Sequence, residues 1–161
     1  MHPASTLVDY ERILTQLYLK KFTLVAEIIR AARGLIDTSV VIDLEQIDSI
    51  DLPVELAVSS ITMAELAAGP HATQDAAERA RRQDRLQRAE AAFDPLPFDS
   101  EASRSYGRIY AAIVSAERKP RGARAVDLLI AATACALDLP LYTRNAEDFV
   151  GLEGIVDIIS I

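Results

Sequence analysis

The spacing of apolar side chains along the chain changes at Gly34. Before it, residues 6–33 contain no glycine or proline and carry apolar side chains every three or four residues, with Lys21 as the exception. That period predicts one long helix, which Gly34 ends. The apolar stripe consists of Leu7, Tyr10, Leu14, Leu17, Leu24 and Ile28.

Three interpretations of this helix stay open. It packs on the domain of its own chain, it docks on a partner or a second copy, or it is a leader that precedes the native start. Residues 1–33 are therefore treated as an N-terminal helical extension of unassigned role, and residues 34–161 as the main domain.

After Gly34, short apolar runs alternate with helical patterns, which predicts an α/β domain with a mostly parallel sheet. Thr38-Ser39 is expected to cap a turn or helix, and Ser59 or Ser60 the helix that follows. Strands are expected at residues 34–37, 55–60, 95–98, 140–145 and 154–161. Helices are expected at residues 61–69, 72–93, 101–119 and 126–139.

A chain of 161 residues, half of them apolar, is the size of one domain with a substantial core. Its single cysteine, Cys135, allows no internal disulfide and suits a reducing cytosol. No apolar run is long enough to span a membrane, and the N-terminus lacks the pattern of a secretory signal. The sequence therefore predicts a cytoplasmic protein.

The net charge of −7 is unevenly distributed. Residues 1–33 hold five Lys/Arg and three Asp/Glu, a net +2, whereas residues 34–161 hold twelve and twenty-one, a net −9. An acidic domain repels nucleic acid unless cations or local arginines intervene. The surplus carboxylates serve solubility, a basic partner or a metal site, and only their positions distinguish these roles.

Several carboxylates lie where parallel strands end or helices begin. Asp37 ends the first expected strand, Glu65 lies about one turn into the helix after the second, and Asp127 starts the last helix. Asn145 ends the fourth strand, with Asp148 three residues beyond. Because sites in open parallel sheets form outside the carboxyl ends of the strands, these side chains are expected to converge.

Clustered carboxylates repel one another unless a cation neutralises them. Mg²⁺ and Mn²⁺ prefer such oxygen ligands, and the metal can polarise a phosphoryl oxygen and activate water. With only His2 and His71 in the chain, a histidine-based zinc site or a Ser-His-Asp triad has little support.

Each acid also has an ordinary structural role. Asp37 can cap a helix, Glu65 can face solvent, and Asp127 can serve as an N-cap or first-turn acid. Further acids are expected in simple roles: Asp99 as an N-cap, and Asp43, Asp48 and Asp51 as solvated loop residues. The set and its order carry more information than any one member.

That set resembles the PIN-domain ribonucleases, specifically the VapC-type toxins of type II toxin–antitoxin pairs. Five pieces match in family order and together cover residues 34–161. They are "LIDTSV" (35–40), "SSITMAELAAG" (59–69), "LPFD" (96–99), "AVDLLIAATA" (125–134) and "LYTRNAEDF" (141–149). The resemblance implies a three-layer α/β/α sandwich around a parallel sheet.

The resemblance also implies a Mg²⁺- or Mn²⁺-dependent endoribonuclease. Asp37, Glu65 and Asp127 match the family's catalytic and metal-binding positions, with Asp37 and Asp127 the clearest ligands. The family position after "TR" is Asn145 here, which brings a carbonyl but no charge, and Asp148 is a candidate for the missing carboxylate.

The implied partners are an RNA substrate, a cognate VapB-type antitoxin whose basic tail enters the acidic groove, and a second copy in a homodimer. Four residues are candidates for orienting ligands or phosphate, with backbone capping as the alternative for Ser39 and Thr143. They are Thr38, Ser39, Thr143 and Arg144.

Arginines before Asp127 are the best-placed RNA contacts, namely Arg121 and Arg124, with Arg144 as a third. A second group crowds the helix at 72–93, where a solvated, salt-bridged face is the expected role. Its members are Arg79, Arg81, Arg82, Arg85 and Arg88.

Other classes fit less well. A haloacid-dehalogenase-like phosphatase needs a second Asp where Ser39 stands, and the chain lacks the glycine motifs of P-loop and dinucleotide-binding proteins. A catalytically inactive PIN-like module that binds protein remains the alternative, because Asn145 replaces a carboxylate.

Overall fold

A computed structural model describes residues 15–18 and 31–161 of the chain. Residues 15–18 are helical, whereas residues 31 and 32 are not and Arg33 begins a strand, so the expectation that the helix continues to Gly34 is wrong. The rest of the helix expected at 6–33 lies outside the described residues. Residues 31–161 form one compact unit. Within the described residues, no helix is long and apolar enough to cross a membrane.

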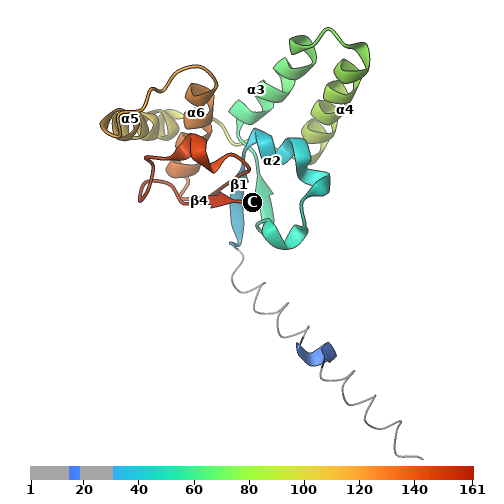
Figure 1. The fold of residues 1–161 in the computed structure, drawn as a ribbon, viewed down its shortest axis with the longest axis horizontal. Coiled ribbons are helices and arrows are strands. Elements are labelled where there is room, and N and C mark those ends of the chain that lie inside the picture. Colours follow the sequence, from blue (N-terminus) through green and yellow to red (C-terminus); the bar gives the residue numbers. More distant parts are fainter. Residues whose placement is uncertain (1–14, 19–30) are drawn as a thin grey trace, which may run out of the picture. The chain divides into compact units, whose positions relative to one another are not determined.

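The compact unit alternates strands and helices along the chain (Figure 1). The strands are β1 Arg33–Ile36, β2 Glu55–Ala57, β3 Leu141–Thr143 and β4 Ile158–Ser160. The α-helices are α2 Thr38–Asp43, α3 Ser60–Ala68, α4 Ala76–Ala92, α5 Ser100–Ser115 and α6 Ala123–Ala136. Short 3-10 helices are η1 Leu44–Gln46, η2 Ser49–Asp51, η3 Gly69–Ala72 and η4 Ala146–Phe149.

The four strands form one parallel sheet in the order β2-β1-β3-β4. The expected mostly parallel sheet is therefore confirmed. The short strand or edge expected at residues 95–98 is present only as one isolated parallel bridge, from Leu96 to Ser59. With two prolines in "PLPF", the segment lacks the backbone donors that a longer ladder requires.

Strand residues alternate between two hydrophobic clusters, one on each face of the sheet. Leu35 and Leu141 belong to the cluster with α5 and α6, whereas Ile36 and Tyr142 belong to the cluster with α2, α3 and α4. Figure 1 shows these two groups of helices on opposite sides of β1. The expected three-layer α/β/α sandwich is thus confirmed, and burial on both faces explains the continuously apolar strands.

Side-chain caps set where most helices begin. Ser59 caps α3 by accepting a hydrogen bond from the amide of Thr62, and Asp99 caps α5, as expected. For α2 the expectation was wrong, since Asp37 is the N-cap and Thr38-Ser39 form the first turn. Helix α6 starts earlier than expected, after Gly122, whose φ of +66° suits a glycine.

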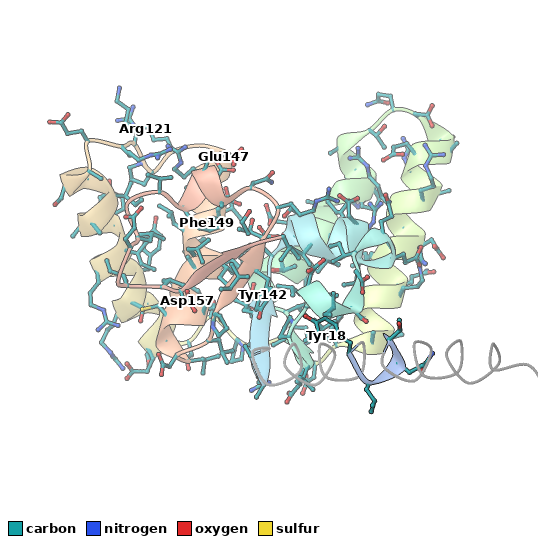
Figure 2. The ribbon with its side chains drawn as sticks, turned by 60° about the horizontal axis from the view of Figure 1, so that its bottom comes forward. Tyr18, Arg121, Tyr142, Glu147, Phe149 and Asp157 are labelled. Atoms are coloured by element: carbon teal, nitrogen blue, oxygen red, sulfur yellow. The ribbon has the colours of Figure 1, made fainter. Side chains whose placement is uncertain are left out.

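Gly34 leaves room for the ring of Tyr142. A Cβ at position 34 would lie 2.6 Å from Cε2 of Tyr142 and 3.0 Å from Cγ of Pro53. Tyr142 is only 6% exposed and packs in the same hydrophobic cluster as Ile36 (Figure 2). Its ring therefore has little space to move. Close packing inside β1, rather than the end of a helix, therefore requires glycine here.

We expect Gly34→Ala to lower the free energy of unfolding by about 1–3 kcal/mol, because an added methyl group overpacks the interior. Gly107→Ala is the matched control, since nothing lies within 4 Å of a Cβ at that position in α5. Alanine should stabilise that helix by up to about 1 kcal/mol. Urea denaturation measures both changes, and equal effects of the two substitutions would contradict the packing argument.

Candidate functional site

The candidate site lies at the carboxyl ends of β1 and β3, where the chain connections from these two neighbouring strands run toward opposite edges of the sheet. From β1 the chain proceeds to β2 on one side, whereas β3 pairs with β1 on the other side. At such a switch point the segments that follow two neighbouring strands diverge and leave a crevice at their carboxyl ends. Asp37 follows β1 directly, and Thr143 ends β3.

Asp37 is a buried carboxylate held by three hydrogen bonds. It is 4% exposed. Its Oδ1 accepts from Ser39 Oγ at 2.6 Å and from the amide of Val40 at 3.0 Å, and its Oδ2 accepts from Thr143 Oγ1 at 2.5 Å. These bonds offset the cost of burying the charge. Asp37 is thus both a helix cap and a site residue.

The segment after β3 is tied to the segment after β1. The amide of Arg144 donates to Ser39 Oγ at 3.0 Å, and the amide of Asn145 donates to Thr143 Oγ1 at 3.0 Å. The guanidinium of Arg144 pairs with Asp43. Asp43 was therefore wrongly expected to be a solvated loop acid, and its partner lies 101 residues away, so no local signal identifies the pair.

Glu65 lies in the second turn of α3, as its distance from the Ser59 cap requires. Its Oε2 accepts a hydrogen bond from Thr38 Oγ1, so the first turn of α2 fixes its carboxylate beside the crevice. The alternative that Glu65 simply faces solvent does not hold, because its side chain is half-buried and oriented by a partner 27 residues away.

Asp127 is placed by α6, and its pKa is raised to about 6. Burial is the largest cause, followed by the negative charges of Asp148, Glu65 and Asp37 in that order, while Arg124 acts in the opposite direction. The alternative that Asp127 is an N-cap or first-turn acid does not hold, because α6 begins at Ala123.

Asp148 belongs electrostatically to this group, and Asn145 contributes no charge to it. Of the three carboxylates that raise the pKa of Asp127, Asp148 has the largest effect. Arg124 lies 3.5 Å from Asp148 Oδ1, and its buried Nε has no hydrogen-bond partner among the described residues. Helix η4, which follows Asn145, brings Asp148 back toward α6.

The donor set fits a hard divalent cation. The site offers carboxylate oxygens whose mutual repulsion, expressed in the raised pKa of Asp127, a cation would relieve. Among the described residues, no three acidic, histidine or cysteine side chains already stand close enough to chelate an ion. Side-chain adjustment or water ligands are therefore needed, and Mg²⁺ characteristically retains several waters.

The arginines expected to contact RNA occupy different settings. Arg121 is exposed on the loop that leads into α6, as Figure 2 shows, whereas Arg124 is half-buried beside Asp148. Arg144 is exposed at the rim and paired with Asp43. On α4, Arg81 and Arg82 pair with Glu78 within the helix, which confirms a salt-bridged face for that part.

A family model described as PIN domain matches residues 34–152. Among curated proteins, ribonuclease VapC5 of Mycobacterium tuberculosis is 34% identical over 130 residues, which cover 79% of this chain and 93% of that protein. Ribonuclease VapC8 of the same species is 40% identical over 102 residues, covering 63% and 89%.

Solved structures agree with this match. VapBC-5 from Mycobacterium tuberculosis, a member of the VapBC family of toxin–antitoxin systems, has a TM-score of 0.71 at 35% identity, covering 81% of this chain and 99% of that chain. VapBC2 from Rickettsia felis has a TM-score of 0.63 at 21% identity, covering 80% and 98%, and supports the fold alone.

The raised pKa of Asp127 predicts how stability depends on pH when metal is removed with EDTA. The folded protein holds this proton up to about pH 6, whereas the ordinary aspartate value is 3.8. The folded state therefore binds more protons than the unfolded state between these values, so the free energy of unfolding falls as the pH rises through this window.

Asp127→Asn removes the charge, so we expect it to raise the Tm of the metal-free protein at pH 7.5. The difference from wild type should shrink toward zero below pH 4. Thermal denaturation followed by circular dichroism, from pH 3.5 to 8 in EDTA, measures it. A variant less stable than wild type at pH 7.5, or a gap independent of pH, would contradict the electrostatic account.

Proposed function

The chain belongs to the PIN-domain family, in which its close relatives are VapC ribonucleases, and from this premise we propose that it is a metal-dependent endoribonuclease toxin. It hydrolyses phosphodiester bonds of RNA. The metal is Mg²⁺ or Mn²⁺, as the all-oxygen donor set favours. A cognate antitoxin neutralises it.

One observation supports this proposal above the others. Acidic side chains from three other segments, those of Asp148, Glu65 and Asp37, add to burial in raising the pKa of Asp127, at the crevice where β1 and β3 end. A protein-binding module that does not catalyse has no need to keep repelling carboxylates half-buried in one place. Asp148 also supplies a negative charge near Asp127, where Asn145 supplies none.

The residues have distinct proposed roles. Asp37 and Asp127 would hold the metal, with Asp148, and Asn145 through its carbonyl, as additional ligands or as partners of bound water. When bound, the metal polarises the phosphoryl group and favours deprotonated water. Arg121, Arg124 and Arg144 are the proposed contacts to the RNA backbone at the rim.

Glu65 is the proposed general base. Thr38 holds one of its oxygens, Oε2, and leaves Oε1 to accept a proton from water. The water oxygen attacks phosphorus, the bond from phosphorus to the 3′-oxygen breaks, and the leaving oxygen takes a proton from solvent. The products therefore carry a 5′-phosphate and a 3′-hydroxyl.

The proposed partner is a VapB-type antitoxin, since the matching structure at 35% identity is a VapBC toxin–antitoxin system. The net −9 of residues 34–161 favours a basic antitoxin segment over the crevice. We also propose a homodimer within a toxin–antitoxin hetero-oligomer. A ribonuclease toxin acts where cellular RNA is, so the cytoplasm is the proposed location.

We expect Asp37→Asn to lower the rate of RNA cleavage by at least about 100-fold. The substitution removes the charge of a proposed metal ligand itself, and not of a residue that only orients a ligand. Cleavage of total cellular RNA by antitoxin-free protein, with Mg²⁺, Mn²⁺ or EDTA, measures the effect. Only wild type with metal should yield discrete fragments, and cleavage in EDTA would contradict the metal-dependent mechanism.

The matched control is Asp51→Asn, which makes the same chemical change at an exposed acid of η2 and should cleave like wild type. The fragment ends test the chemistry separately. A 2′,3′-cyclic phosphate would exclude attack by water, and an inactive but folded wild type would favour the non-catalytic protein-binding module.

A further inference from the structure

A small pocket lies beside the carboxylates, between α2, α3 and α4. Its volume is about 280 Å³, toward the small end of ligand pockets. Thr38 and Glu65, joined by their hydrogen bond, form the wall nearest the crevice. The other walls include Ile42, Leu66, Arg82 and Arg85. A group bound here would therefore lie next to the proposed general base.

Arg82 is a fixed part of this pocket. Its Nε donates to Glu78 Oε1 at 2.7 Å, and its NH1 donates to the carbonyl of Gly69 at 3.1 Å. Hydrogen bonds from Arg82 and then Arg81 lower the pKa of Glu78, so this carboxylate stays charged and compensates both guanidinium groups. Arg82 thus forms part of the pocket wall, and Glu78 already neutralises its charge.

Arg85 differs from its neighbours on α4. It is half-buried, and among residues 15–18 and 31–161 its side chain has no hydrogen bond or ion pair. Arg88, one turn further, pairs with Glu45 and Asp84. A guanidinium carries five N–H donors in a planar fork, so Arg85 offers the pocket unmatched donors and positive charge.

The rest of the pocket is partly apolar. Ile42 is 43% exposed, and Leu66 in the pocket wall is only 6% exposed. An apolar wall next to unpaired donors matches an unstacked nucleobase, which has an apolar face and acceptor atoms on its edge. A phosphate alone needs no apolar wall, and the donors of Arg85 require acceptor atoms, which the cationic side chains of a basic antitoxin segment lack.

We propose that Arg85 is a specificity-determining residue for RNA cleavage, an inference that rests on the function proposed above. The pocket receives the base adjacent to the scissile phosphate of single-stranded RNA. The base packs against Ile42, and Arg85 donates hydrogen bonds to acceptor atoms on its edge. The enzyme therefore prefers a base with such acceptors at this position.

The test compares cleavage-site preferences on a pool of random-sequence single-stranded RNA, read by sequencing the new 5′ ends. Full-length wild type should prefer one base next to the cut. Arg85→Gln should reduce that preference about tenfold, whereas Arg85→Lys, which keeps the charge but loses the fork, should restore it only in part. Arg88→Gln is the control, because it removes one charge from the same helix outside this pocket.

A second measurement separates base contact from phosphate contact. Binding of 20-nucleotide RNAs, with and without the preferred base, is followed across a salt series in the Asp37→Asn background. Arg85→Gln should abolish the difference between the RNAs. A uniform loss with a shallower salt dependence would make Arg85 a phosphate contact and overturn the inference.

Two further outcomes are distinguishable. If wild type cleaves with a base preference that Arg85→Gln leaves intact, and only antitoxin affinity changes, the pocket belongs to the antitoxin and the inference fails alone. If folded, antitoxin-free wild type cleaves no RNA with either metal, the proposed function fails and the inference falls with it.

Discussion

The site depends on the hydrogen bond from Thr143 to Asp37. It joins the end of β3 to the end of β1, at the point where the sheet reverses its order, across 106 residues of sequence. Together with the bonds from Ser39 and Val40, it supplies donors to a carboxylate that is only 4% exposed. Without these donors, the cost of burying the carboxylate would not be offset.

The position of Asp37 also bears on the acids around it. Asp127 is placed by α6, and its pKa is raised to about 6, first by burial and then by the negative charges of Asp148, Glu65 and Asp37. Arg124 offsets part of this charge from the Asp148 side, and Arg144 pairs with Asp43 at the rim. The described residues alone compensate the cluster incompletely, and under the proposed function a divalent cation would complete the compensation.

The same balance of charge explains why the arginines of α4 are not equivalent. Glu78 matches Arg81 and Arg82, while Glu45 and Asp84 match Arg88. Arg85 lines both the pocket beside Glu65 and a second pocket against η1 without such a match among the described residues. The sequence shows only that α4 is strongly charged. The structure distinguishes Arg85 as the arginine of this helix whose side chain has no hydrogen bond or ion pair among the described residues.

The sequence by itself determined the alternation of strands and helices, the Asp99 cap of α5 and the serine cap of α3. It also determined that Asp37 follows β1 and that Glu65 and Asp127 lie in α3 and α6. These features follow from local periodicity and capping, which act within a few residues. Only the tertiary structure decided which strand lies beside β1, that Arg144 pairs with Asp43, and that Asp148 acts more strongly on Asp127 than Glu65 or Asp37 does. Those outcomes depend on contacts between segments far apart in the chain, and local propensity carries no information about such pairs.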